Sequence, residues 1–305
     1  MGFTSWARRT AAAIRQDGWV GVNDGLYGLY AGAWRTLGWH VPRGTNVYER
    51  DWDLLVVLDA CRTDLLREVA PNYEFIGDVE SIESVGSMSE EWLVKTFMPE
   101  YADELRDTVH VTANVFSEEV LDADNFRDLD EVWRYGWDDD SGIVPPRPVT
   151  DRAIHHGRTR DPDRLIVHYM QPHHPFIADG VPEFESDPFG REGNATVVDA
   201  LRRGDIGYEE FWAAYRANLE LVLADVRLLL SNYDAERAVL TADHGDALGE
   251  WGIYDHPAGF LHPIVRNVPW AETEGVDEGT YEPSTERGRS GGEDVEQRLR
   301  DLGYV

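Results

Sequence analysis

Lysine and cysteine are nearly absent from this sequence of 305 residues. Its only lysine is Lys95, and its only cysteine is Cys61. A single cysteine excludes an intramolecular disulfide and a zinc site made of four thiolates. Basic residues are also few, with 28 Lys and Arg against 58 Asp and Glu, which gives a net charge of −30. This balance excludes a generic nucleic-acid-binding protein, because such proteins neutralise phosphates with a basic surface.

The acid excess, combined with the near absence of lysine, indicates a halophilic protein. In molar salt the repulsion between charges is screened over about 3 Å, so a strongly negative chain can stay compact. An ordinary acidic enzyme is the alternative. If the protein is halophilic, its general acidity says nothing about the ligand that it binds.

Long apolar runs are missing as well. The sequence contains no stretch of about 18 apolar residues, so no membrane-spanning helix is predicted. Residues 11–14, after Arg8 and Arg9, form too short an apolar stretch for a secretion signal, and we expect a cytoplasmic protein. Residues 1–47 carry five Arg, two Asp and several aromatic side chains. They are predicted to form an N-terminal helical arm packed on the main domain, with peripheral contact to an anionic membrane surface as the alternative.

Strand and helix patterns alternate over residues 48–270. Apolar runs typical of buried strands occur at residues 54–58, 108–112, 165–170 and 238–241. Amphipathic stretches between them, notably residues 90–97 and 208–230, predict helices. This alternation predicts an α/β catalytic domain with a mainly parallel central sheet and helices on both faces.

The composition changes after residue 270. Residues 271–292 are rich in Glu, Gly, Ser, Thr and Pro, which predicts an acidic flexible linker. Residues 293–305 regain helical spacing and are predicted to form a C-terminal helix that docks on the catalytic domain.

Acidic and imidazole side chains come directly after the predicted strands. Asp59 ends the first strand, and Asp243 and His244 follow the strand at residues 238–241. Because the carboxyl ends of parallel strands meet at one edge of the sheet, these side chains can hold a divalent cation together. The alternative for each Asp is a helix cap.

Further histidines follow other strands. His173 and His174 lie between two prolines, which stiffen the turn and project the imidazoles, and a pair of solvated loop histidines is the alternative. His256 follows Asp255 a few residues after the Asp243 motif.

Several motifs resemble, in the correct order, those of the alkaline phosphatase/sulfatase superfamily, sulfatase-like branch, over roughly residues 50–305. They are VVLDACRTD at 56–64, PHHPF at 172–176, TADHGD at 241–246 with LGE at 248–250, VPW at 268–270, and residues 295–305. The resemblance implies a divalent metal ion, Mn, Zn, Mg or Ca, held by Asp59, Asp243 and His244. It also implies catalytic roles for His173 and His256 at the bound ester. His174 and Arg62 are expected to contact the substrate anion, with a role at the protein surface as the alternative for Arg62.

The family places a nucleophile at the N-terminus of a helix between the two ligand motifs. By position this is Ser89, with Ser87 as second choice and otherwise expected at the substrate. The alternative is that Ser89 only caps its helix. Neither serine, nor Cys61, has the sequence context for oxidation to formylglycine that classical sulfatases show.

The resemblance therefore implies a metal-dependent hydrolase or transferase of sulfate or phosphate esters with a Ser nucleophile. Its substrate would be a small-molecule or glycan ester. The alternative is a catalytically inactive protein of the same fold that binds a glycan or a lipid head group.

Overall fold

A seven-stranded sheet forms the centre of the protein in the computed structural model, which describes residues 19–181 and 196–285. Its order is β2 (Glu80–Glu83), β9 (Asn267–Gly275), β6 (Ala235–Thr241), β1 (Leu54–Leu58), β5 (Arg164–Tyr169), β3 (Thr108–Thr112) and β4 (Asp128–Glu131). Only β9 runs antiparallel to its neighbours β6 and β2. The predicted α/β class with a mainly parallel sheet is confirmed.

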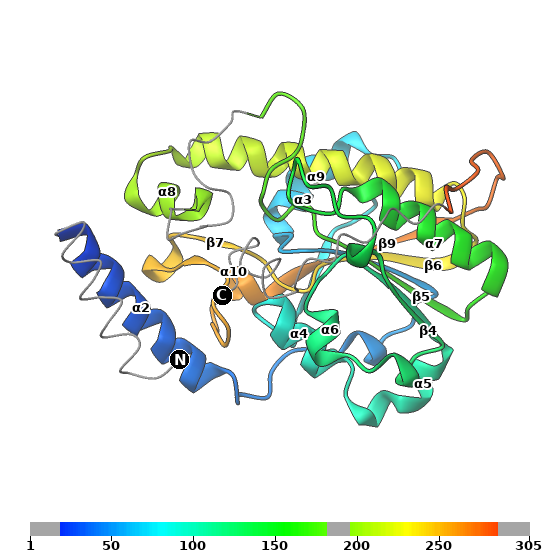
Figure 1. The fold of residues 1–305 in the computed structure, drawn as a ribbon, viewed down its shortest axis with the longest axis horizontal. Helices are drawn as coiled ribbons and strands as arrows, with labels where there is room; N and C mark the ends of the chain where they lie inside the picture. The colour runs from blue at the N-terminus through cyan, green and yellow to red at the C-terminus, as the bar shows by residue number, and fades with distance from the viewer. Residues whose placement is uncertain (1–18, 182–195, 286–305) are drawn as a thin grey trace.

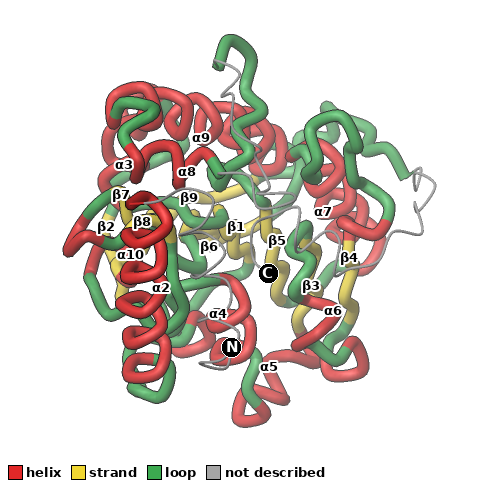
Figure 2. The backbone as a smooth tube through the Cα atoms, turned by 60° about the vertical axis from the view of Figure 1, so that its left-hand side comes forward, coloured by secondary structure: helices red, strands yellow, loops and turns green. Residues whose placement is uncertain are grey.

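The helices lie in two layers, one on each face of the sheet (Figure 1). One layer contains α3 (Thr63–Val69), α7 (Pro146–Arg160) and α9 (Tyr208–Leu230). The other contains α4 (Ser89–Thr96), α5 (Ala102–Asp107) and α6 (Ser117–Val120). Figure 2 shows the same two layers from a second direction. Helices on both faces explain why central strands are apolar along their whole length.

The core is built around β1, whose five residues are all fully buried between β5 and β6. Burying an aliphatic side chain of this size contributes roughly 1.5–3 kcal/mol, so this strand contributes strongly to stability. On α9 the buried side chains recur every three or four positions, as an amphipathic helix requires. They include Phe211, Tyr215, Leu219, Val222, Val226 and Leu229.

Smaller elements complete the described part. They are α8 (Val197–Arg203), β7 (Ala247–Leu248), β8 (Tyr254–Asp255), α10 (Pro263–Arg266), and the 3-10 helices Val47–Glu49, Ala70–Asn72, Pro99–Tyr101, Ala123–Asn125, Val132–Arg134 and Glu250–Gly252. β7 and β8 pair as a separate antiparallel ribbon.

Helix α2 (Trp19–Gly38) lies within the segment predicted to be an N-terminal arm and packs beside β8 (Figure 2). The Tyr27 hydroxyl donates a 2.6 Å hydrogen bond to the Tyr254 carbonyl, and Trp34 stacks on Trp251. At the helix end, a Cβ on Gly38 would lie 1.7 Å from the Gly259 carbonyl oxygen, so this close approach requires glycine. Within the described ranges, no helix combines the length and apolarity needed to cross a bilayer.

The prediction of a flexible linker from residue 271 onward is wrong for residues 271–285. β9 continues to Gly275, with Glu272 and Glu274 exposed on alternate positions of the strand. Residues 276–285 then pack on α7, where the Tyr281 hydroxyl donates to Asp151 at 2.7 Å. A strand with one solvated face has the same polar composition as a linker, which explains the error. Residues 286–292 and the predicted C-terminal helix lie outside the described residues.

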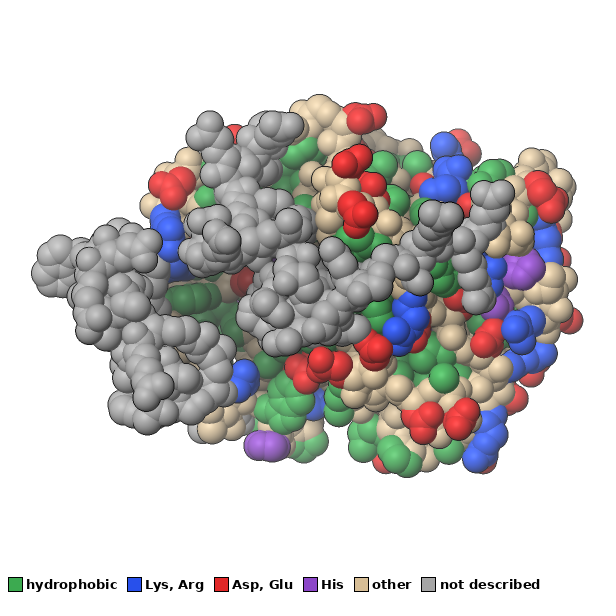
Figure 3. Space-filling model, viewed as in Figure 1, with side chains coloured by type: hydrophobic (Ala, Val, Ile, Leu, Met, Phe, Trp, Pro, Cys, Tyr) green, Lys and Arg blue, Asp and Glu red, His purple; other side chains and the backbone are tan. Residues whose placement is uncertain are grey.

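Acidic side chains are scattered over the face shown in Figure 3 and do not form a single patch there. The acidic excess is thus spread over the described part of this face.

Candidate active site

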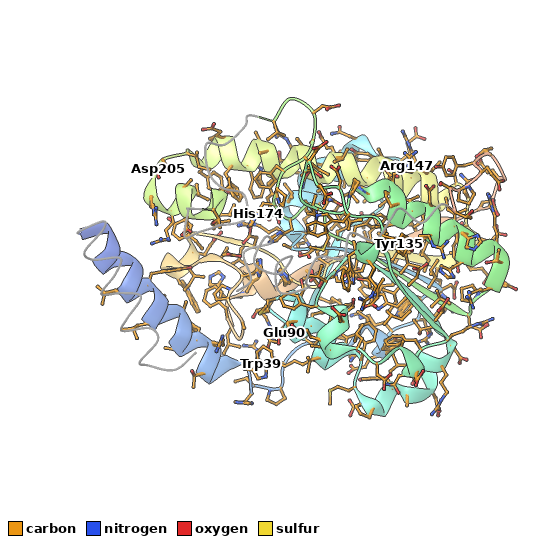
Figure 4. All side chains as sticks on the ribbon, viewed as in Figure 1. Trp39, Glu90, Tyr135, Arg147, His174 and Asp205 are labelled. Carbon is orange, nitrogen blue, oxygen red and sulfur yellow. The ribbon has the colours of Figure 1, made fainter. Side chains whose placement is uncertain are left out.

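Three segments bring a serine, two carboxylates and a histidine together. Asp59 directly follows β1, and Asp243 and His244 follow its neighbour β6. Ser89 is the first residue of α4, whose N-terminal end is marked by the labelled Glu90 in Figure 4. All four side chains are fully buried. The predicted convergence at the carboxyl ends of the strands is therefore present, and we call these four residues the Ser89 cluster.

The Ser89 hydroxyl lies at the centre of this cluster. Its Oγ donates to Asp243 Oδ2 at 2.7 Å and lies 3.4 Å from Asp59 Oδ2 and 3.3 Å from His244 Nε2. Ser89 is not the helix cap, because the N-cap position is held by Met88. The serine hydroxyl is directed to a carboxylate instead of to an amide of its own helix.

The hydrogen bonds of His244 define which ring nitrogen faces the cluster. Its Nδ1 lies 2.9 Å from the Gly245 carbonyl oxygen, which can only accept, so Nδ1 carries the proton. Nε2 therefore presents its lone pair 3.5 Å from Asp59 Oδ1 and 3.3 Å from Asp243 Oδ2. Burial lowers the pKa of His244 well below its usual value, so the ring is neutral. A neutral imidazole oriented in this way is typical of a metal ligand.

The carboxylates of the Ser89 cluster repel one another. Burial, followed by repulsion from Asp243, raises the pKa of Asp59 well above its usual value. Asp59 Oδ1 has no hydrogen-bond partner within the described residues. Ligands about 2.0–2.1 Å from a tetrahedral ion lie about 3.3 Å from one another, close to most of the distances given above. The donor set and its spacing thus fit a divalent metal ion.

A second group of titratable side chains adjoins the first. The ring centroids of His244 and His256 are 4.3 Å apart. His256 Nε2 lies 2.8 Å from Asp255 Oδ1 and 2.9 Å from His173 Nε2. Burial lowers the pKa of His256, but attraction to Asp255 outweighs it and raises the pKa to about 10. His256 is therefore protonated at neutral pH, beside the Ser89 cluster.

The two histidines of the proline-flanked loop are buried, and neither is a solvated loop histidine. The His173 Nδ1 bonds to the His174 carbonyl oxygen, so Nε2 of His173 presents its lone pair to His256. His174, labelled in Figure 4, has no hydrogen-bond partner among the described residues, and burial lowers its pKa to about 4. Asn218 on α9 fixes this loop through hydrogen bonds to the carbonyls of Pro172 and His173.

Ser87, the second choice for the nucleophile, has other contacts. Its Oγ lies 2.8 Å from Glu91 Oε2 and 3.0 Å from the Pro257 carbonyl oxygen, and it accepts from the Phe260 amide at 3.1 Å. These contacts join the loop before α4 to the loop after β8. The geometry therefore favours Ser89 over Ser87 as the group that faces the carboxylates.

Arg62 is engaged by acids outside the Ser89 cluster. Its Nε and Nη2 donate to the Asp64 carboxylate at 2.9 and 2.7 Å, and Nη1 donates to Glu250 at 3.0 Å. The Asp246 carbonyl oxygen also accepts from Nη1. With all three nitrogens committed, the structure does not support the expected contact of Arg62 with a substrate anion. The prediction of a substrate contact did not take into account Asp64, which follows Arg62 by two positions and pairs with it.

Two residues beside the Ser89 cluster, Asn114 and His168, were not predicted from the sequence. Asn114 follows β3 as Asp59 follows β1, and its Nδ2 donates to Asp59 Oδ2 at 3.3 Å. His168 lies within β5, with Nε2 3.7 Å from Asp243 Oδ2. The strand-end position was a usable signal for Asn114. His168 is enclosed in an apolar run, where its pattern is that of a core residue.

Comparison with known proteins shows the fold. No protein-family model and no curated protein sequence matches the chain. The integral membrane protein lipooligosaccharide phosphoethanolamine transferase A from Neisseria meningitidis aligns with a TM-score of 0.51 and 13% identity, over 99% of this chain and 63% of that one. This chain thus spans less than two thirds of the length of that transferase.

Two further solved structures are similar at lower TM-scores. One is a protein in complex with its substrate D-glucosamine-2-N,6-O-disulfate, with a TM-score of 0.48 and 15% identity over 74% of this chain and 71% of that one. The other is a protein in the alkaline phosphatase superfamily from Vibrio parahaemolyticus, with a TM-score of 0.43 and 12% identity over 74% and 60%. At these identities the similarity shows the fold alone, and the chain shares the fold of the transferase from Neisseria meningitidis.

The predicted cytoplasmic location is wrong. The transferase from Neisseria meningitidis, which shares the fold of this chain, is an integral membrane protein. The absence of a long apolar run in the sequence was therefore not sufficient to place this fold in the cytoplasm.

Proposed function

We propose that this protein is a metal-dependent enzyme that acts on phosphate or sulfate esters, with Ser89 as the nucleophile. The observation that carries the proposal is the position of Ser89 Oγ. It lies at the start of a helix, 2.7 Å from Asp243 Oδ2 and next to Asp59 and His244. A hydroxyl among buried carboxylates and a neutral imidazole is poorly explained as a structural feature, since each buried charge there costs stability.

The metal ligands in this proposal are Asp59, Asp243 and His244. A bound divalent ion would lower the pKa of the Ser89 hydroxyl and offset the negative charge of the ester oxygens. Asn114 holds Asp59 by donating to its Oδ2, and the Ala60 amide holds Asp243 by donating to its Oδ1 at 3.1 Å. These contacts fix the carboxylates before an ester binds, as an efficient site requires.

The first half-reaction forms a covalent ester on Ser89. Its Oγ attacks the phosphorus or sulfur atom, the new bond forms, and the bond to the leaving oxygen breaks. The hydroxyl proton passes to solvent, because a bound divalent ion would lower the pKa of Ser89. The leaving oxygen takes a proton from His256, which Asp255 keeps charged at neutral pH.

The second half-reaction releases Ser89. Water in a hydrolase, or a second alcohol in a transferase, attacks the ester on Ser89, and its proton passes to the now neutral His256. The bond to Ser89 Oγ breaks, and the oxygen regains a proton from solvent. His173 positions His256 for both steps through the 2.9 Å contact between their Nε2 atoms.

Phosphate esters are favoured over sulfate esters in this proposal. An unmodified serine is suited to phosphoryl transfer through a covalent intermediate. A sulfated serine lacks the route by which a formylglycine hydrate expels sulfate, and no formylglycine context surrounds Ser89. The substrate class is a small-molecule or glycan ester.

The test is a parallel assay on an aryl phosphate and an aryl sulfate in high salt, with and without a chelator. We expect turnover of the phosphate that the chelator abolishes and added metal restores. Intact-mass analysis at high mass accuracy should then detect a phosphoryl adduct on trapped enzyme. A protein that binds metal yet turns over neither ester would contradict the proposal and favour an inactive binding protein for a glycan or a lipid head group.

A further inference from the structure

His168 is a buried imidazole without a hydrogen-bond partner among the described residues. It lies one residue before the end of β5, with none of its surface exposed. Neither Nδ1 nor Nε2 bonds to any residue of the described ranges. An unsatisfied buried polar group costs about 1–3 kcal/mol, so such a group in a native protein needs an explanation, of which a bound ion is one.

The ring is placed against the carboxylates of the Ser89 cluster. His168 Nε2 lies 3.7 Å from Asp243 Oδ2, too far for a hydrogen bond. One ligand atom each from His168, Asp59 and Asp243 lies within 4.8 Å of the others. Two ligands of one ion can be at most about 4.2 Å apart, and the 3.7 Å between His168 Nε2 and Asp243 Oδ2 lies below this limit, so these two atoms can bind the same ion. Burial lowers the pKa of His168 to about 4, which keeps its lone pair available.

We propose that His168 Nε2 is an additional ligand of the metal ion, beyond Asp59, Asp243 and His244, and that it selects the metal. The inference rests on the proposed function only in requiring an ion at the Ser89 cluster. Two imidazoles with two carboxylates favour Zn, Mn or Co, because Mg and Ca prefer oxygen ligands throughout. Of the four metals that the sequence left open, Mn, Zn, Mg and Ca, the proposal favours Mn and Zn.

His110 provides a matched control. Its ring stacks on that of His168, with centroids 6.2 Å apart and an interplanar angle of 10°. It is equally buried and equally without hydrogen-bond partners among the described residues. It differs in lying one strand further from β1, away from the two carboxylates. A role confined to core packing predicts the same behaviour for both histidines.

The test compares His168→Phe and His110→Phe by calorimetric binding of Zn and Ca to the chelator-treated protein in high salt. We expect His168→Phe to weaken Zn binding by more than about 100-fold. The loss of a side chain that only hydrogen-bonds to a metal ligand usually weakens metal binding by about 10- to 100-fold. Its Ca binding should stay within about threefold, and His110→Phe should bind both ions as the wild type does. His168→Leu serves as a second variant if the phenylalanine does not fold.

X-ray absorption at the zinc edge, with less than one equivalent of Zn, counts the imidazoles directly. We expect the wild type and His110→Phe to show one imidazole more than His168→Phe. Equal counts in all three, or equal losses of Zn and Ca affinity, would overturn the role of His168 while leaving the proposed function intact. Failure of the wild type to bind Zn would instead contradict the metal site of the proposed function.

Discussion

Ser89 Oγ and Asp243 Oδ2 are 2.7 Å apart, although 154 positions separate the two residues in the chain. Two residues after Ser89, Glu91 lies in the first turn of α4 and is fully buried. Glu91 Oε2 accepts from the Ser87 and Gly259 amides, and its Oε1 accepts from Lys95 at 2.5 Å. Lys95, the only lysine of the protein, thus holds the carboxylate that joins the loop before α4 to the loop carrying His256.

Replacement of Ser89 should separate catalysis from binding. We expect Ser89→Ala to lower turnover by at least about 10,000-fold, because the covalent route is removed, while metal binding persists. Ser87→Ala should retain turnover within about tenfold and lower stability by about 1–3 kcal/mol, since the Phe260 amide loses its acceptor. Steady-state kinetics and metal titration measure both effects. The opposite pattern would move the nucleophile to Ser87, and near-normal turnover in both variants would point to direct attack by water.

Removal of one carboxylate should release the metal. Asp243→Ala is expected to abolish stoichiometric metal binding and leave the fold intact in high salt, because it deletes a charged ligand and relieves its repulsion with Asp59. Elemental analysis after gel filtration measures the metal content. Asp225→Asn is the control, since this buried carboxylate pairs with Arg147 at 2.6 Å. Stoichiometric metal in Asp243→Ala would disprove the ligand assignment.

Acid should destabilise the protein through Asp130. Burial raises the pKa of this carboxyl, but hydrogen bonds from His156, Tyr135 and Arg152 outweigh it and bring the pKa well below the usual range. A depressed pKa in the folded state stabilises the protein above the unfolded pKa of about 3.9, and this stability is lost as the pH falls below about 5.

Thermal melts between pH 5 and pH 3 test this prediction. Asp130→Asn should lose less stability over that interval than the wild type, because it has no carboxylate to protonate there. Asp103→Asn removes an exposed carboxylate paired with Arg106 and should follow the wild-type curve. Parallel curves for all three proteins would argue against a role of Asp130 in acid stability.

Salt should control stability. With a net charge of −30, we expect the melting temperature and the helical circular dichroism signal to fall as salt decreases from molar to about 0.1 M. The Debye length grows to about 10 Å at that concentration, so repulsion between carboxylates is no longer screened. Sucrose at equal osmolarity, which carries no charge, controls for crowding. Unchanged melting across the range would refute the halophilic interpretation.

Local sequence patterns were enough to predict the sheet and the polar groups at one edge of it. The apolar run at residues 54–58 and its counterparts are long enough only for buried strands, and parallel strands bring the residues after their carboxyl ends to the same edge. Asp59, Asp243 and His244 were therefore predictable as neighbours. The sequence around Glu272 and Glu274 did not distinguish a strand from a linker, because strands with a solvated face and linkers have a similar polar composition.

Which polar groups face the carboxylates depends on contacts between distant segments and was visible only in the folded protein. Ser87 and Ser89 have the same local sequence environment, yet one contacts Glu91 and the other Asp243. Arg62 donates a hydrogen bond to Glu250, 188 positions away, and this contact holds it away from the site. His168 lies in an apolar strand, and its role depends on side chains brought to it by other strands. Distances between segments remote in sequence are set by packing, which no local pattern encodes.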